Sequence, residues 1–139
     1  MRFLLDTCVL SELRKPDCNP NVKFAISNCS NKDLFISSIS IGEITKGVSL
    51  LEEGRRKKEL SNWLNSLESQ FADRILSVDA ETARIWGELT ADGKRKGKPI
   101  PIMDGLIAAT AIRSGLHVMT RNIQDFENTS AMLFNPWES

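Results

Sequence analysis

Near its start, the 139-residue chain has the stretch Phe3-Leu4-Leu5-Asp6-Thr7, in which a short apolar run is followed by an acid. Consecutive large apolar residues without polar alternation are typical of a parallel strand that is covered on both faces. Residues 7–14 then carry apolar side chains at helical spacing, so a helix is expected directly after the strand. An acid that ends a buried strand needs a partner, because burying an unpaired charge is costly. Asp6 is therefore the first candidate for a functional residue.

The pattern of a predicted strand followed by a predicted helix continues along the chain. Short apolar runs predict four more strands, at residues 34–38, 74–78, 116–120 and 131–134. Amphipathic stretches predict helices that begin at Pro20, Ser40, Arg55, Asp79 and Met103, the last ending at Gly115. Strands that alternate with helices favour an α/β sandwich around a mainly parallel sheet.

Composition indicates one domain over residues 1–139. Lys plus Arg and Asp plus Glu each number 18, which gives a net charge of zero. Hydrophobic residues at 41% and charged residues at 26% are ordinary for a globular protein, and they exclude a disordered tail, a collagen and a strongly basic nucleic-acid coat. Any nucleic acid must be bound through local patches of charge.

No membrane segment and no zinc site are expected. The apolar stretch at residues 106–112 is far shorter than the roughly 18–20 residues that a spanning helix needs, and the run at residues 3–5 is too short for a signal peptide. The chain has three cysteines without a CxxC pattern and one histidine, His117. Free cysteines suit a reducing compartment, so we expect a cytoplasmic protein.

Four acids fall where the strands of the predicted sheet end. Asp6 closes the first strand, Glu43 lies one helical turn beyond the second, Asp125 follows the fourth, and Asp104 lies in the first turn of the helix before the fourth. Ligands of open parallel sheets bind at the carboxyl ends of the strands, so these acids are expected to converge. Packed carboxylates repel one another and favour a cation. All-oxygen ligation selects a hard ion such as Mg²⁺ or Mn²⁺.

Each acid except Asp6 also has a purely structural interpretation. The spacing from Ser40 to Glu43 is that of a capping box. Asp104 suits the positive end of a helix dipole, and Asp125 suits the cap of a turn over residues 125–127. Asp79 follows the third strand and is expected to be only an N-cap.

Basic residues near these strand ends are candidates for phosphate contacts. Arg121 and Asn122 follow Thr120 at the end of the fourth strand, where a phosphate contact is plausible. Residues 94–98 are strongly basic and lie close in sequence to Asp104, although a solvated loop is the favoured interpretation of this run. Trp137 is expected to anchor the C-terminal segment, and no aromatic platform for stacking bases is apparent.

Five motifs in one order resemble VapC-type toxins, the PIN-domain ribonucleases of type II toxin–antitoxin pairs. They are residues 3–7, residues 36–44 with Gly47, residues 101–108, residues 120–126 and residues 135–137. Each motif alone is weak, but together they span the whole chain.

The resemblance implies a three-layer α/β/α sandwich with a mainly parallel five-stranded sheet. It implies an endoribonuclease that uses Mg²⁺ or Mn²⁺ to activate water, cleaves an RNA such as a tRNA and leaves a 5′-phosphate and a 3′-hydroxyl. Asp6 and Asp104 would be the main metal ligands, completed by Glu43 and Asp125, and Thr120 would orient Asp6 or a phosphate. The implied partners are a second copy of the chain and a small antitoxin whose tail fills the acidic groove.

Two positions depart from the pattern of the resembled family. Some members carry an acid where this chain has Asn122, and others use the position of Asp125, so either residue is a candidate for the fourth ligand. Cys8 stands where many members have Asn. Two alternative functions stay open: a receiver-type signalling domain, which would need adjacent acids after the first strand, and a PIN-fold binding module with an inactive site.

Overall fold

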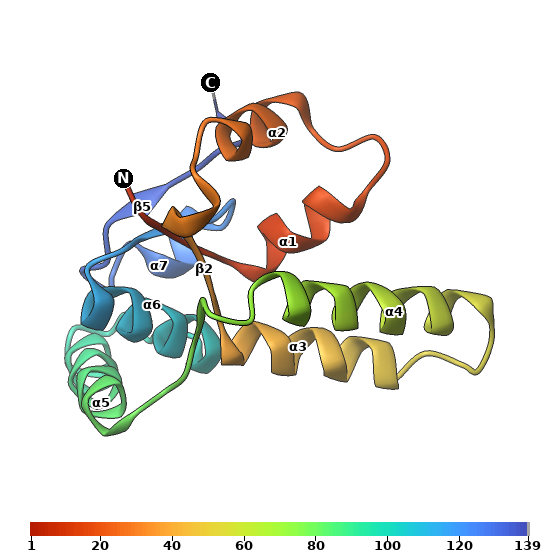
Figure 1. The fold of residues 1–139 in the computed structure, drawn as a ribbon. Helices are drawn as coiled ribbons and strands as arrows, with labels where there is room; N and C mark the ends of the chain where they lie inside the picture. The colour runs from red at the N-terminus through yellow and green to blue at the C-terminus, as the bar shows by residue number, and fades with distance from the viewer. Residues whose placement is uncertain (139) are drawn as a thin grey trace.

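The computed structural model describes residues 1–138 and shows a five-stranded parallel sheet in the order β3-β2-β1-β4-β5 (Figure 1). The strands are β1 (Phe3–Leu5), β2 (Leu34–Ser37), β3 (Ile75–Leu76), β4 (His117–Met119) and β5 (Leu133–Phe134). The helices are α1 (Thr7–Arg14), α2 (Pro20–Ser27), α3 (Ser38–Ser49), α4 (Arg55–Gln70), α5 (Ala80–Arg95), α6 (Ile102–Ser114) and α7 (Ile123–Phe126), with one 3₁₀ turn, η1 (Asn31–Asp33). The predicted fold class is confirmed.

Helices cover both faces of the sheet, and the central strand β1 divides its side chains between them. Phe3 and Leu5 pack into a core with residues of α1, α2, α3 and α4. Leu4 points to the opposite face and packs against α6, β4 and Phe126 of α7. Each β1 side chain is at most 6% exposed. The uninterrupted apolar run at residues 3–5 therefore has the cause expected from the sequence, namely burial on both faces.

The register of β1 brings three chain segments to the same edge of the sheet. Phe3 lies opposite Leu34 of β2, and Leu5 lies opposite Met119 of β4. The parallel ladder then continues for one bond beyond β1, because the Asp6 N–H donates to the Met119 carbonyl at 3.0 Å. Asp6, the start of α3 and Thr120 consequently lie next to one another at the carboxyl ends of β1, β2 and β4.

The structure corrects the predicted start of α3. The helix begins at Ser38 and not at Ser40, because the Ser37 hydroxyl accepts the Ile39 N–H at 3.0 Å and caps the helix as soon as β2 ends. Ser40 is a buried residue inside α3, so the capping box between Ser40 and Glu43 was wrong. Asp79 does cap α5, as expected, by accepting the Thr82 N–H at 2.8 Å.

Two further boundaries differ from the sequence-based expectation. The third strand is only Ile75–Leu76, because the chain pairs with a single neighbour, β2, at this edge of the sheet. Residues 123–126 form the one-turn helix α7, so Asp125 lies inside a helix and does not cap a turn. No helix within residues 1–138 is long and apolar enough to cross a membrane.

The connection from α5 to α6 fixes where α6 begins. The Lys98 N–H donates to the Gly93 carbonyl at 2.8 Å and folds the chain back against α5. A side chain on Gly93 would place its Cβ 2.7 Å from the Lys98 carbonyl oxygen. Gly93 therefore permits a close backbone approach that positions Pro101 and the first turn of α6, which carries Asp104.

We predict that Gly93→Ala destabilises the fold by about 1–3 kcal/mol, because the added methyl group overpacks against backbone that cannot move away freely. Gly87→Ala is the matched control in the same helix, since a Cβ there meets nothing within 4 Å. The control is expected to stabilise the protein by roughly 0.5–1 kcal/mol through helix propensity. Urea unfolding measures both, and equal effects of the two substitutions would contradict the close approach at Gly93.

Candidate active site

Asp6 occupies the end of β1 and the N-cap of α1, and its carboxylate is almost completely enclosed. The residue is 5% exposed. Its Oδ1 accepts the Thr7 N–H at 2.9 Å, and its Oδ2 accepts the Thr120 hydroxyl at 2.8 Å. The Cys8 thiol donates to Oδ2 at 3.6 Å. Burial raises the pKa of Asp6, and these hydrogen bonds to the charged form oppose that rise.

Glu43 is held beside Asp6 by a residue that touches both acids. The Thr7 hydroxyl donates to Glu43 Oε1 at 2.9 Å, while the Thr7 N–H binds Asp6. The Thr7 hydroxyl also lies 3.0 Å from the buried Ser40 hydroxyl, one helical turn before Glu43 on α3. Thr7 thereby ties the first turn of α1 to α3 and fixes one oxygen of Glu43.

The pKa of Asp104 is raised by burial and by the charges of the other three acids. Burial is the main cause that raises the pKa of Asp104 from 3.8 to about 6, and the charges of Asp6, Asp125 and Glu43 contribute to this rise. The charge of Asp125 also raises the pKa of Asp6. Asp104 therefore lies within electrostatic range of the other three predicted acids. We call this set, Asp6, Glu43, Asp104 and Asp125, the acidic edge.

The end of β4 supplies the other polar groups of the acidic edge. The Thr120 hydroxyl binds Asp6 and accepts the Asn122 N–H at 3.0 Å. Asn122 and Asp125 are both exposed and lie on either side of the first turn of α7, joined by the Asp125 N–H to the Asn122 carbonyl at 3.1 Å. The exposed residue Arg121 donates its N–H to the Cys8 sulfur at 3.5 Å.

The donor chemistry of the acidic edge fits a hard divalent cation, but the ligand shell is not closed by protein groups. Within residues 1–138, no group of three or more His, Cys, Asp or Glu side chains stands close enough together to hold a metal ion. Mg²⁺ usually keeps several waters and binds only one or two carboxylates directly. Carboxylates that raise one another's pKa without a nearby cation are stabilised by such an ion.

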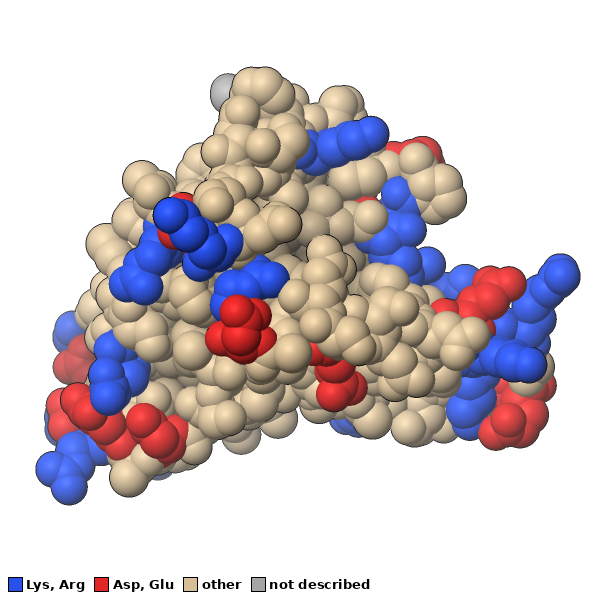
Figure 2. Space-filling view, in the orientation of Figure 1, with Lys and Arg blue, Asp and Glu red and all other residues tan. Residues whose placement is uncertain are grey.

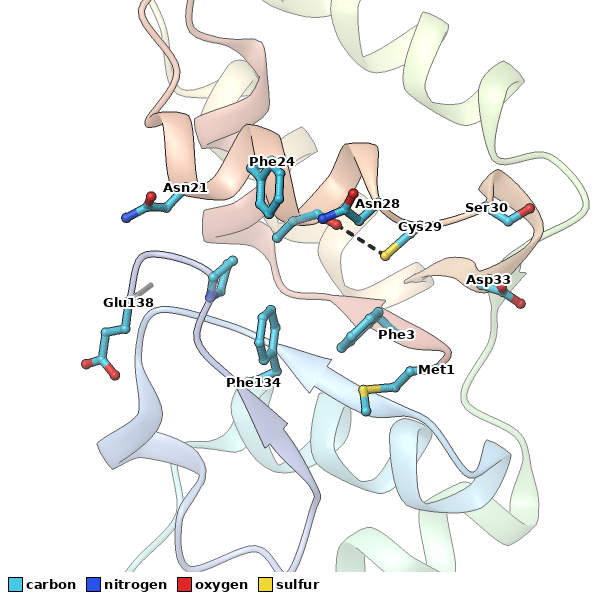
Figure 3. Close-up of a pocket in the computed structure, with 12 residues that line it drawn as sticks. Met1, Phe3, Asn21, Phe24, Asn28, Cys29, Ser30, Asp33, Phe134 and Glu138 are labelled. Carbon is cyan, nitrogen blue, oxygen red and sulfur yellow. Dashed lines mark hydrogen bonds between the residues drawn. The ribbon is translucent and has the colours of Figure 1, made fainter.

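The acidic edge is separate from an apolar hollow of about 550 Å³ between α2 and the C-terminal segment. Figure 3 shows the rings of Phe3, Phe24 and Phe134 around this space, with Cys29 bonded to the Ala25 carbonyl at 3.3 Å. None of the four acids lines it. The hollow is therefore a separate feature, lined by apolar side chains together with polar residues such as Asn28 and Asp33.

Surface charge does not form one large field of a single sign. On the face in Figure 2, basic and acidic side chains mix around α5 and at the end of α4 that is farthest from the sheet, and the middle is mostly uncharged. In the basic run at residues 94–98, Lys96 pairs with Asp92 at 3.0 Å. On this face, a ligand would therefore be attracted by individual charged side chains and not by one large patch of a single sign.

Three residues of the site have contacts that the sequence did not predict. The Thr7 hydroxyl binds Glu43 and Ser40, and Cys8 contacts Asp6, with its own pKa raised by burial and by the Asp6 charge so that it stays a thiol. A signal for Ser40 was its spacing of three residues from Glu43, which places both on one face of α3. The Thr7–Glu43 bond joins residues 36 positions apart and had no local signal.

The raised pKa of Asp104 predicts how stability depends on pH in EDTA. An acid whose pKa is higher in the fold costs stability once it ionises, so the cost is absent below about pH 4 and complete above about pH 6. We expect Asp104→Asn to raise the melting temperature by on the order of a few degrees at pH 7.5. The gain should shrink to nothing as the pH falls through 6 to 4.

Asp17→Asn, an exposed position in the connection between α1 and α2, is the control and should show no such pH-dependent gain. An Asp104→Asn gain that is the same at pH 4 and pH 7.5 would show that the acids do not repel one another.

Comparison with known proteins identifies the family to which the chain belongs. The PIN domain family pattern matches residues 3–131. The chain is 38% identical to the toxin FitB of Neisseria gonorrhoeae over 97% of this chain and 98% of that protein. It is 35% identical to the VapC ribonuclease Y4jK of Sinorhizobium fredii over 98% of each. The crystal structure of FitAcB from Neisseria gonorrhoeae matches with a TM-score of 0.91 and 37% identity over 99% of both chains.

These similarities cover nearly the full length of both proteins in each comparison, and they agree with the sheet order and with the strand-end acids described above. The chain belongs to the PIN domain family, among its VapC-type toxins.

Proposed function

We propose that this protein is the toxin of a type II toxin–antitoxin pair and an endoribonuclease that hydrolyses RNA at the acidic edge. The observation that carries the proposal is that Asp6, Glu43 and Asp125 follow the carboxyl ends of β1, β2 and β4, within electrostatic range of Asp104 in the first turn of α6. Similarity to the toxin FitB and to a VapC ribonuclease supports it. A tRNA is the first substrate to test, since the VapC-type pattern implies one.

Asp6 and Asp104 would be the main ligands of a divalent cation, and Glu43 and Asp125 would complete its surroundings directly or through water. A bound Mg²⁺ or Mn²⁺ would lower the pKa of water and neutralise charge on the phosphate oxygens. PIN-domain nucleases generally depend on a divalent metal, and the choice between Mg²⁺ and Mn²⁺ is part of the proposal.

The side chains around these acids would keep the site in one geometry during hydrolysis. The Thr7 N–H and the Thr120 hydroxyl each donate to one oxygen of Asp6 and so fix the orientation of its carboxylate. The Thr7 hydroxyl fixes Glu43 Oε1 and leaves Oε2 free to act. Positioning of this kind increases the rate of hydrolysis by large factors, because the reacting groups need no reorganisation.

The hydrolysis itself cleaves the bond between phosphorus and the 3′ oxygen of the preceding nucleotide. Water adds to phosphorus and loses a proton, the bond from phosphorus to the 3′ oxygen breaks, and the 3′ oxygen takes up a proton from solvent, so that the products are a 5′-phosphate and a 3′-hydroxyl. The acidic edge would face the phosphodiester and accept the proton that water loses.

The protein would be silenced by a small antitoxin whose tail covers the acidic edge, and it would act as a homodimer. A basic group on that tail would match the four carboxylates in charge. Occlusion of the acids by such a tail would exclude both the cation and the RNA.

Substitution of the acids tests the proposal. We expect purified protein to cut total tRNA into discrete fragments with Mg²⁺ or Mn²⁺, and EDTA to stop the cleavage. Asp6→Asn and Asp104→Asn should each reduce the rate by about a hundredfold or more, while Asp17→Asn should cut normally. Circular dichroism checks that the variants fold. Cleavage that survives EDTA, or that survives Asp104→Asn, would exclude the metal assignment.

The fourth position of the acidic edge can be tested separately. We expect Asp125→Asn to slow cleavage by roughly 10–100-fold, as for groups that orient a metal site. Asn122→Ala should change the rate by less than about threefold, because its contact with Thr120 uses the backbone N–H. The reverse ranking of the two variants would make Asn122 the functional residue at this position.

A further inference from the structure

The backbone of Arg121 lies beside the acidic edge, and its guanidinium lies over the ring of Trp137. The guanidinium carbon is 5.3 Å from the ring centroid, which is a cation–π contact. Arg121 directly follows Thr120, and its N–H donates to the Cys8 sulfur, which in turn donates to Asp6. The backbone of Arg121 is thus fixed next to the acids while its side chain is exposed.

Trp137 is held in place by contacts that do not involve Arg121. The Asn21 side-chain amide donates to the Trp137 carbonyl at 3.0 Å, and the Trp137 N–H donates to Asn135 Oδ1 at 2.9 Å. The indole is partly buried against the core shared by α1 and α2. Trp137 is therefore a fixed surface on which the guanidinium rests, rather than a side chain that Arg121 recruits.

The guanidinium keeps its hydrogen-bond donors available. Over residues 1–138, no carboxylate lies within 4.0 Å of Arg121 as an ion-pair partner. Glu12 is in charge range, but its oxygens already accept the Asn19 N–H at 2.8 Å and the Lys15 ammonium at 3.2 Å. A guanidinium that lies on an aromatic face presents its N–H groups in one plane, an arrangement that matches two phosphate oxygens.

We propose that Arg121, oriented by Trp137, forms a subsite that binds an RNA phosphate next to the one that is hydrolysed. This inference rests on the proposed ribonuclease function. The acidic edge repels an RNA backbone, so a cation at its rim supplies the attraction that holds the flanking phosphate in register. Phosphate contacts of this kind set the position of a nucleic acid without reading its sequence.

The test measures binding without cleavage. Asp104→Asn protein serves as the parent and binds end-labelled total tRNA in EDTA at several salt concentrations. Adding Arg121→Gln should weaken binding about tenfold, which is the effect of one charge-assisted contact. It should also reduce the slope of log Kd against log salt by about 0.7 to 0.9, the value for one phosphate contact. Arg56→Gln, exposed in the first turn of α4, removes the same charge elsewhere and should leave both quantities unchanged.

Variants of Trp137 separate orientation from charge. Trp137→Leu should weaken binding about threefold and keep the parental salt slope, because the charge of Arg121 remains. Trp137→Phe retains a ring face and should restore most of the loss. Thermal unfolding of each variant confirms that it is folded at the assay temperature.

The outcomes distinguish the subsite from the proposed function. Equal effects of Arg121→Gln and Arg56→Gln on a parent that binds tRNA would overturn the subsite and leave the ribonuclease proposal standing. A wild-type protein that neither binds nor cuts tRNA, but loses an antitoxin when Arg121 is changed, would overturn the subsite and the proposed ribonuclease activity, leave the toxin–antitoxin assignment standing, and assign Arg121 to the protein partner.

Discussion

The buried carboxylate of Asp6 is the constraint on which the rest of the site depends. A charge at the end of a central strand is costly to bury unless its oxygens are paired. Its partners come from two places in the chain, the Thr7 N–H just beyond it and the Thr120 hydroxyl at the end of β4. The second partner exists only because β1 and β4 pair in the observed register, so the sheet and the site require each other.

Repulsion among the carboxylates of the acidic edge lowers the stability of the fold. Asp104 is the clearest case, because burial and three neighbouring carboxylates hold its pKa well above the ordinary range. A protein built only for stability would not gather acids in this way, and active sites commonly trade stability for function. The same repulsion gives the acidic edge its affinity for a cation. The networks through Thr7, Ser40 and Thr120 hold the carboxylates in place without neutralising them.

How far the sequence predicts this protein depends on whether a feature is local. α1 was predicted with its observed bounds and β1 to within one residue, because an apolar run and a helical stripe meet at Asp6, which was placed at the end of the strand and is the N-cap of the helix. The four acids were found from the rule that sites form at strand ends. The start of α3 was misplaced, since Ser37, Ser38 and Ser40 are all suitable caps and only the end of β2 selects Ser37. The contacts of Thr7 with Glu43 and of Arg121 with Trp137 are tertiary and follow only from the packed structure.

The titration of Asp104 tests the central claim most directly. Carboxyl-carbon NMR on the folded protein follows this residue with EDTA and then with excess Mg²⁺. Burial and the neighbouring carboxylates together predict an apparent pKa near 6 in EDTA and a clear fall when the cation binds. A pKa close to the ordinary value of an aspartate, unchanged by Mg²⁺, would show that the four carboxylates do not act as one site.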